Sequence, residues 1–280
     1  MREVHWERIS KAVAELFKKI NYYLNEDVYN ALKKSLEIEE SPVGKRVLCQ
    51  LLENAEIAAE ERIPLCQDTG IAVVFISLGQ EVIIKGKNLE DAVNIGVAEG
   101  YSEGYLRKSV VRDPIKRINT GNNTPAIIHT EIIPGDKIKI TVSAKGGGSE
   151  NMSAMSMLSP AAGSEGIIDF VLETVKRAGP NPCPPIIVGV GVGGNFELAP
   201  LLAKKALLRP LNEKNEDEFW RNMEDILLQK INSLGIGPQG FGGRITALKV
   251  SIETFPCHIA SLPVAVNIDC HCHRHWTIEI

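Results

Sequence analysis

Three of the six cysteines in the sequence lie in polar or proline-rich surroundings that a core cysteine does not need. Cys66 is followed by Gln67 and Asp68, and Cys183 has prolines on both sides that restrict its backbone. Cys270 follows a strand-like apolar run. Three thiolates without a fourth match an iron–sulfur cluster with one open iron, whereas electron-transfer clusters usually have four protein ligands. These cysteines are far apart in the chain, so only the fold can bring them together.

The other three cysteines leave alternatives open. Cys49 lies among apolar residues of a helical pattern, which predicts a buried structural thiol. Cys257 and Cys272 are alternatives to Cys270 as the third ligand. The tail over residues 271–275 is rich in His and Cys and could instead hold zinc, although an extended segment directs alternate side chains to opposite faces.

A glycine run at Gly189–Gly194 follows a strand pattern and precedes a helical one, so it formally fits the G-x-G-x-x-G dinucleotide fingerprint. That fingerprint also requires an acidic residue at the end of a second strand, about 20 positions further on. The corresponding region here, residues 212–217, is a charged stretch before a helix. The favoured interpretation is therefore that the glycines allow a strand and a helix to pack closely.

Composition excludes several classes of protein. The 280 residues are 44% hydrophobic and 24% charged, as in an ordinary globular protein. The net charge of −4 leaves no excess positive charge for a nucleic acid partner. The most apolar runs, 71–78 and 185–192, are too short to span a membrane, and the charged N-terminus has no secretory core, so we expect a cytoplasmic protein without a membrane partner.

Hydrophobic periodicity predicts an α/β fold, with mixed β-sheets, flanking helices and a helical N-terminal lead-in over residues 1–62. Within the lead-in, helices are expected at 9–23, at 28–36 and from Pro42, with Ser41 as the N-cap. Further helices are expected at 88–106, 163–177, 196–208 and 216–234. Strands are expected at 71–78, 81–85, 125–133, 137–143, 185–192, 244–253 and 264–268. The turn Gly79-Gln80 predicts that the first two strands form a hairpin.

Four glycine- or proline-rich connections contain more polar groups than a simple turn needs. They lie at 64–70, 120–125, 145–152 and 235–243. Such loops often gather at one end of a sheet, where backbone N–H groups can hold an anion. Arg107 and His258 are polar side chains that could hold a dianionic substrate by charge-assisted hydrogen bonds.

Six segments, in order along the chain, resemble the α subunit of class I fumarate hydratase and L-tartrate dehydratase. They are PLCQDTG at 64–70, NTGNNTPA at 119–126, KGGGSENM at 145–152, GVGGNFE at 191–197, LGIGPQG at 234–240 and HIASLPV at 258–264. The resemblance extends from about Ile63 to Arg274. The chain departs from the family at Asn122, where Asp is frequent, and at 271–273, where the family has small residues.

The resemblance implies one α-type catalytic domain over residues 1–280 of an oxygen-sensitive 4Fe-4S hydro-lyase. Cys66, Cys183 and Cys270 match the cluster cysteines of the family. The implied reaction is the reversible hydration of fumarate to malate, with L-tartrate dehydration as the alternative. Less favoured alternatives are an NAD-binding enzyme and a non-enzymatic metal-binding scaffold.

The resemblance also assigns roles at a site for a small dicarboxylate. Asp68 and His258 match catalytic positions, Asp68 as the carrier of the proton for the leaving oxygen and His258 as the group that assists it. The implied substrate-binding residues are Gln67, Arg107, Gly146, Gly147 and Gly148. A separate β subunit is expected to supply the base at carbon, in a homodimer or heterotetramer.

Overall fold

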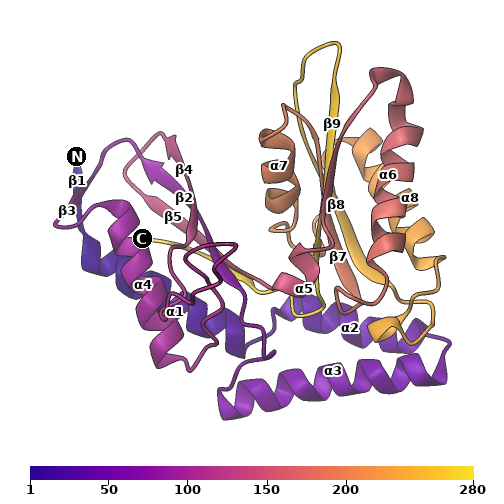
Figure 1. Ribbon diagram of the computed structural model, residues 1–280, viewed down its shortest axis with the longest axis horizontal. Coiled ribbons are helices and arrows are strands. Elements are labelled where there is room, and N and C mark those ends of the chain that lie inside the picture. Colours follow the sequence, from indigo (N-terminus) through magenta and orange to yellow (C-terminus); the bar gives the residue numbers. More distant parts are fainter. The chain divides into compact units, whose positions relative to one another are not determined.

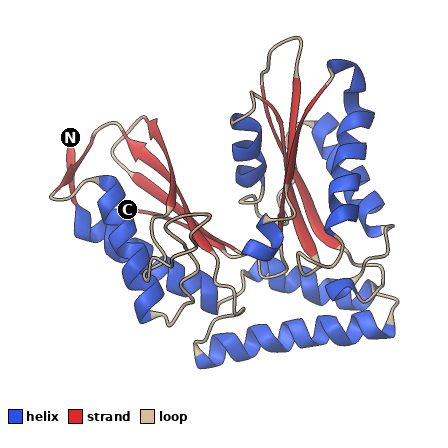
Figure 2. Cartoon of the chain, viewed as in Figure 1, coloured by secondary structure: helices blue, strands red, loops and turns tan.

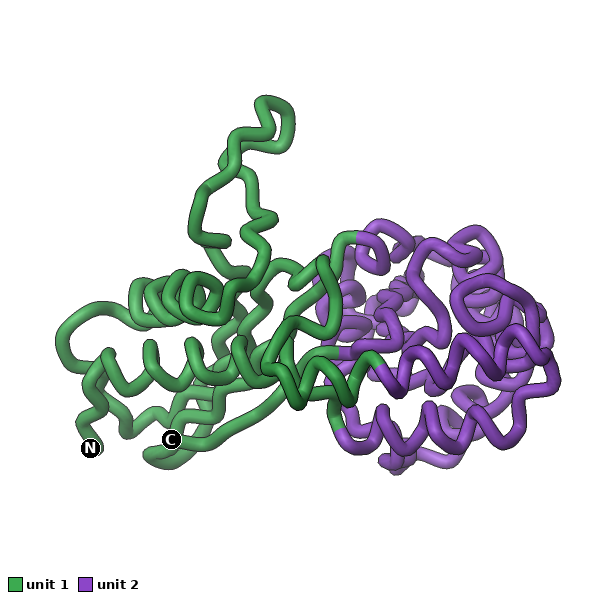
Figure 3. Tube along the Cα trace, turned by 90° about the horizontal axis from the view of Figure 1, so that it is seen from below, with its two compact units in different colours: residues 1–25, 54–147, 274–280 green, residues 26–53, 148–273 purple.

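The computed structural model describes all 280 residues, and the chain divides into two compact units. Unit 1 contains residues 1–25, 54–147 and 274–280, and unit 2 contains residues 26–53 and 148–273 (Figure 3). The proposed single domain over 1–280 stays a prediction. None of the helices combines the length and apolar character that crossing a bilayer requires.

Unit 1 is built on a four-stranded sheet in the order β10-β5-β2-β4, with a two-stranded sheet β1-β3 beside it (Figure 1). Its strands are β1 (Arg2–His5), β2 (Ile71–Gly79), β3 (Val82–Lys85), β4 (Ile127–Ile133), β5 (Ile138–Lys145) and β10 (His275–Glu279). Helices α1 (Trp6–Tyr22) and α4 (Leu89–Glu103) pack against each other and cover one face of the sheet. The core of this unit comes from the apolar positions spaced three and four apart on α1, such as Val13 and Phe17, and from alternate residues of β2 and β5.

Unit 2 is a three-layer structure in which one sheet lies between two layers of helices (Figures 1 and 2). Its sheet order is β6-β9-β7-β8, from β6 (Ala154–Leu158), β7 (Ile186–Gly193), β8 (Ala247–Phe255) and β9 (Leu262–Asp269). On one face lie α6 (Gly163–Ala178) and α8 (Glu218–Asn232), and on the other lies α7 (Leu198–Ala206). The remaining α-helices are α2 (Glu26–Ile38), α3 (Pro42–Glu61), which runs on into unit 1, and the single turn α5 (Gly147–Glu150). Two short 3-10 helices, η1 (Pro160–Ala162) and η2 (Pro238–Gly240), complete the helical elements.

The glycines of β7 allow α7 to approach the sheet closely. A Cβ atom added to Gly189 would lie 2.1 Å from the carbonyl oxygen of Ala203, and one on Gly191 would lie 2.1 Å from that of Ala199. Both distances are far below van der Waals contact, so only glycine fits. The structure thus confirms that this run serves close strand–helix packing.

Strand directions decide which loops of unit 2 lie together. β7 and β8 are parallel, whereas β9 is antiparallel to β7 and β6 is antiparallel to β9. The segments before β6, β7 and β8 and the segment after β9 therefore share one end of the sheet, which we call the cysteine end because it carries Cys183 and Cys270. The β8–β9 turn, residues 256–261, lies at the opposite end.

Most expected elements are confirmed, but the expected hairpin is wrong. β2 pairs with β4 and β5, while β3 pairs in parallel with β1. The turn at Gly79-Gln80 binds the β4–β5 connection instead, since Gly79 N donates to Lys137 O and Gln80 N donates to Ile133 O. Strands β1, β6 and β10 were not expected from the sequence, so the lead-in over 1–62 begins with a strand.

The expectation of a buried Cys49 is also wrong. Cys49 is exposed on α3, although the neighbouring Val47 and Leu48 are buried. Apolar neighbours in sequence do not share a helix face when they are one or two residues away. The expected N-cap of α3 is confirmed, because Ser41 Oγ accepts a hydrogen bond from Gly44 N at 3.1 Å.

A buried carboxylate joins the α2–α3 connection to the segment before β8 in unit 2. Glu39 is 1% exposed, and its Oε1 accepts hydrogen bonds from the backbone N–H groups of Glu40, Ser41 and Arg244, while its Oε2 accepts one from Ile245. Burial alone would raise the pKa of Glu39, but the four hydrogen bonds outweigh it and lower the pKa below its ordinary value.

We expect Glu39→Gln to destabilise the protein by about 2 kcal/mol at pH 7, because an amide cannot satisfy N–H donors at both of its terminal atoms. Since the folded pKa is lowered, the ionised group stabilises the fold above its unfolded pKa, and this contribution is lost as the pH falls through the folded value. Urea unfolding at pH 7 and near pH 4 should show the difference from wild type shrinking at acid pH. Glu40→Gln is the matched control, because its ion pair with Arg244 is exposed and its loss should cost under about 0.5 kcal/mol.

Candidate functional site

Asp68 is held in unit 1 by two backbone N–H groups. Its Oδ1 accepts a hydrogen bond from Gly70 N at 3.0 Å and its Oδ2 accepts one from Gly147 N at 2.8 Å. A Cβ atom on Gly146 would lie 3.3 Å from Asp68 Oδ2, so the backbone of the 145–147 loop lies directly against the carboxyl group. Each oxygen keeps a further lone pair, and the carboxyl group is therefore oriented while still able to accept a proton.

The loop that carries Asp68 is fixed from three distant parts of unit 1. The buried hydroxyl of Tyr101, on α4, lies 2.8 Å from Thr69 O, and Asn123 Nδ2 donates to Gly70 O at 3.2 Å. Arg274 Nη1 donates to Asp68 O at 2.6 Å. Burial raises the pKa of Tyr101, so its hydroxyl stays a donor at every working pH.

The predicted substrate-binding residues of unit 1 gather around this loop. Thr69 Oγ1 donates to the carbonyl oxygen of the exposed Arg107 at 3.0 Å, which holds the backbone of Arg107 against the residue that follows Asp68. Gly146 and Gly147 contact Asp68 as described. Gly148 belongs to unit 2, as does His258. Unit 1 therefore brings the carboxyl group of Asp68 close to the backbone of Arg107 and to the 145–147 loop, and a carboxylate together with an arginine is suited to binding a hydroxy acid.

Cys66 lies two residues before Asp68 and is partly exposed. The residue before it is held at both backbone groups, since Leu65 N donates to Asn21 O at 2.7 Å and Asn54 Nδ2 donates to Leu65 O at 3.0 Å. The thiol therefore stands on a fixed stretch of backbone in unit 1.

The second and third predicted ligands lie together in unit 2. Cys183 precedes β7 and Cys270 follows β9, and Ile187 is paired with Asp269 across these two strands. Cys183 is exposed with a positive φ of 57°, and Cys270 is partly exposed. Their loops touch, because a ring nitrogen of His271, Nδ1, lies 3.1 Å from the Cys183 carbonyl oxygen.

Gln239 and His271 tie these two cysteine loops to the segment before β8. The backbone N–H of Gln239 donates to Pro184 O at 2.7 Å, and its side-chain Nε2 lies 2.8 Å from the same oxygen and 3.2 Å from His271 Nδ1. His271 replaces a small residue of the family pattern. It adds a contact between the loops of Cys183 and Cys270 that a small side chain cannot make.

A buried pair supports Cys270 from the other side. Asp269 Oδ1 accepts a hydrogen bond from Cys270 N at 3.0 Å, and Asp269 Oδ2 lies 2.9 Å from His273 Nδ1. Cys272 is buried, with its Sγ 3.4 Å from His271 Nε2. Of the two thiols in this turn, Cys270 is the more accessible, which favours it as the ligand.

His258 lies apart from these cysteines. It belongs to the exposed β8–β9 turn, where its Nδ1 accepts a hydrogen bond from Ala260 N at 3.1 Å. This turn is at the end of the unit 2 sheet opposite the cysteine end. The eight residues of β9 span about 25 Å, so His258 does not reach Cys183 or Cys270 of its own unit.

The donor set fits an iron–sulfur cluster in its chemistry. The three predicted ligands, Cys66, Cys183 and Cys270, are each at least partly exposed on loops held by hydrogen bonds. No three His, Cys, Asp or Glu side chains within either unit are placed to hold a metal ion together. The residues 271–275 do not gather as a zinc site, because His271 and His273 bind different partners and His275 lies in β10.

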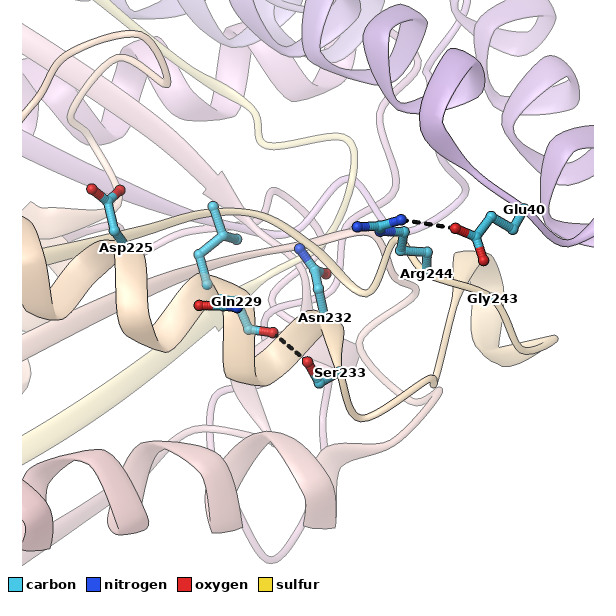
Figure 4. Close-up of a pocket in the computed structure, with 8 residues that line it drawn as sticks. Glu40, Asp225, Gln229, Asn232, Ser233, Gly243 and Arg244 are labelled. Carbon is cyan, nitrogen blue, oxygen red and sulfur yellow. Dashed lines mark hydrogen bonds and ion pairs between the residues drawn. The ribbon is translucent and has the colours of Figure 1, made fainter.

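A cavity of about 660 Å³ contains none of the predicted site residues. It lies beside α8 in unit 2, and Figure 4 shows the ion pair between Arg244 and Glu40 at one side and the side chains of Asp225 and Gln229 at the other. These groups are solvated, and the cavity adds nothing to the predicted chemistry.

A family model described as "Fumarate hydratase (Fumerase)" matches residues 10–279, nearly the whole chain. The chain belongs to the class I fumarate hydratase family. The model's span includes the Asp68 loop, both cysteine loops of unit 2 and the β8–β9 turn, and this membership confirms the resemblance found in the sequence motifs.

Several relatives of this fumarate hydratase family chain are named as tartrate enzymes. A Methanocaldococcus jannaschii protein, provisionally named L(+)-tartrate dehydratase subunit alpha, is 46% identical over 276 residues, 95% of each chain. The L(+)-tartrate dehydratase alpha subunits of Escherichia coli K12 and Shigella boydii are each 32% identical over 277 residues, 98% of this chain and 91% of theirs.

Sequence reasoning missed the residues that orient the site. Tyr101 and Arg274 hold the Asp68 loop from α4 and from the start of β10, and Gln239 and His271 connect the cysteine loops. Gln239 and His271 lie in segments already singled out, the 235–243 loop and the tail. Tyr101 had no signal, because a buried tyrosine at a helical apolar position looks like any core residue.

Proposed function

We propose that the chain is the α-type subunit of a 4Fe-4S hydro-lyase of the fumarate hydratase family that acts on L-tartrate. The observation that carries this proposal is the oriented carboxyl group of Asp68 beside Arg107, in a family member that also presents three accessible thiols. The curated relatives' names support tartrate, the alternative in the sequence interpretation, over fumarate.

We assign Cys66, Cys183 and Cys270 as the residues that hold the cluster. A cluster iron held there supplies Lewis-acid chemistry, which makes hydroxide a better leaving group. Asp269 and His273 keep the Cys270 turn in its conformation, and Gln239 and His271 hold it against the loop of Cys183.

The acid–base work on the leaving oxygen is assigned to Asp68. Two N–H groups fix the direction of its carboxyl group, and the remaining lone pairs can take or return the proton as water leaves or adds. Arg107 binds a substrate carboxylate with its guanidinium, and Gln67 with the Gly146–Gly148 backbone binds the remaining polar groups. The proton on the neighbouring carbon goes to a base of the β-type subunit.

His258 is assigned to the site of a second copy of the chain. Because its turn lies at the end of the sheet opposite Cys183 and Cys270, it cannot serve the cysteine end of its own unit. The His258 of a second copy is not bound by this distance within one unit. The assignment agrees with the expected dimeric or heterotetrameric assembly.

Loss of water from tartrate breaks one C–O and one C–H bond and gives the enol of oxaloacetate, which tautomerises to the keto acid. Fumarate hydration uses the same proton transfers but a substrate without the second hydroxyl. Fumarate hydration is the second candidate, supported by the description of the matching family model. A site that hydrogen-bonds that hydroxyl can discriminate between the two acids by about 10⁴-fold.

The test is anaerobic assay of the chain co-expressed with its β-type partner and loaded with iron and sulfide. We expect kcat/KM for L-tartrate to exceed that for malate by at least about 100-fold, and the α chain alone to have almost no activity. Higher efficiency with fumarate and malate would transfer the proposal to fumarate hydration. A chain that holds one zinc and no iron would overturn the hydro-lyase altogether.

A further inference from the structure

One long loop of unit 1 stands away from the helices and sheet of that unit (Figure 3). Residues 108–120, which we call the arm, connect α4 to β4. The arm folds back on itself through Arg112 N to Ile118 O, Thr120 N to Val110 O and an antiparallel bridge between Val111 and Asn119. Its form is therefore fixed by its own backbone hydrogen bonds.

The tip of the arm is both cationic and apolar. Ile115 is 87% exposed and Ile118 58% exposed, beside the exposed Lys116 and Arg117. The arm carries four cations and one carboxylate, whereas the whole chain has a net charge of −4. Exposed apolar side chains on a preorganised, charged element are typical of a binding surface.

The base of the arm is tied to the candidate site. Asn123 Oδ1 accepts hydrogen bonds from Ser109 N and Val110 N, and the Nδ2 atom of the same side chain binds Gly70 O in the Asp68 loop. A partner that covers the base of the arm therefore lies next to the Asp68 loop.

Unit 2 offers a surface of complementary charge. A cavity of about 290 Å³ beside the end of β8 is lined by Glu213, Glu216, Asp217 and Glu253, whose carboxylates outnumber the two cations there. Burial raises the pKa of Glu253, so its ion pair with Arg209 does not fully offset the loss of hydration. Exposed Phe219 and Phe255 flank this acidic cavity in the sequence.

We propose that the arm of one copy docks, through its cationic tip, at the acidic cavity of unit 2 of a second copy. An extended half of the arm, from Lys108 to Pro114, reaches at most about 20 Å, which is comparable to the five-residue path from Glu253 to His258. If the docked arm lies along this path, the second copy's β8–β9 turn comes alongside the base of the first copy's arm. In a two-fold dimer the contact occurs twice.

This inference rests on the proposed function only for the role of His258. The test measures the mass of the particle and not its activity, so it can fail while the proposed function stands. Native mass spectrometry and light scattering of the full chain, alone and with its β-type partner, should find two copies per particle. We expect Lys116→Glu/Arg117→Glu to raise the dissociation constant of the two copies by about 100-fold, because like charges then face each other.

Two further variants make the test decisive. Lys45→Glu/Arg46→Glu reverses an exposed Lys-Arg pair on α3 and should leave two copies per particle. Adding Glu213→Lys/Glu216→Lys to the arm variant should restore the dimer by swapping the charges. The proposal is overturned if the wild-type particle contains a single copy, or if the arm variant still contains two. It is also overturned if the arm variant loses the β-type partner and not the second copy, or if the charge swap does not restore the dimer.

Discussion

Replacing Cys270 with serine is expected to abolish iron binding and hydro-lyase activity, while Cys272→Ser keeps both. Cys270 is accessible, and its turn is held by Asp269 and His273, whereas the thiol of Cys272 is buried against His271. A serine hydroxyl is a poor ligand for a cluster that takes cysteine thiolates. The measurement is iron and sulfide content after anaerobic reconstitution, with Cys66→Ser and Cys183→Ser expected to behave as Cys270→Ser does.

Cys49→Ser is the control for loss of a thiol alone, because Cys49 is exposed on α3 and belongs to no predicted site. Unfolding midpoints of the apo forms separate a folding defect from a ligand defect. Equal iron content in wild type and Cys270→Ser, with Cys272→Ser depleted, would assign the third ligand to Cys272. Full iron content in Cys66→Ser, Cys183→Ser and Cys270→Ser would remove the cluster from the proposal.

The elements that sequence analysis predicted are those whose signals are local. The spacing of Val13 and Leu16 shows the buried face of α1, and Ser41 marks the start of α3 through a hydrogen bond within one turn. Which two strands pair with each other is not determined by local sequence. A β-branched run identified β3 as a strand, but its partner β1 is four residues near the N-terminus, and nothing in either segment specifies the other.

The residues of the candidate site also fall into two groups, those that a local motif identifies and those that only the fold brings near. Asp68 and Cys66 could be predicted because their motif is unusual for a structural segment. The partners that orient Asp68 lie as far away as Arg274, and only the fold brings them together. His258 shows the limit most clearly, since its motif predicts a role while the strand order, which no motif contains, decides that it lies away from Cys183.

Asp68→Asn is expected to lower kcat of the reconstituted α–β complex by about 10²–10⁴-fold while its iron content stays that of wild type. An asparagine side chain has nearly the same shape, but its amide cannot take up or return the proton. The carboxylate of Asp68 accepts hydrogen bonds from both Gly70 N and Gly147 N. In the asparagine variant the amide nitrogen would face one of these two N–H groups and could not accept its hydrogen bond. KM should change much less than kcat, because Arg107 still binds the substrate carboxylate.

Tyr101→Phe separates positioning from proton transfer in this prediction. It removes the hydroxyl that holds the carbonyl groups of Thr69 and Gly70 and leaves the Asp68 carboxyl group intact, so kcat should fall by a smaller factor than in Asp68→Asn. Wild-type turnover with a complete cluster in Asp68→Asn would show that another group carries the proton, and the two backbone hydrogen bonds to its carboxylate would then serve only to close the loop.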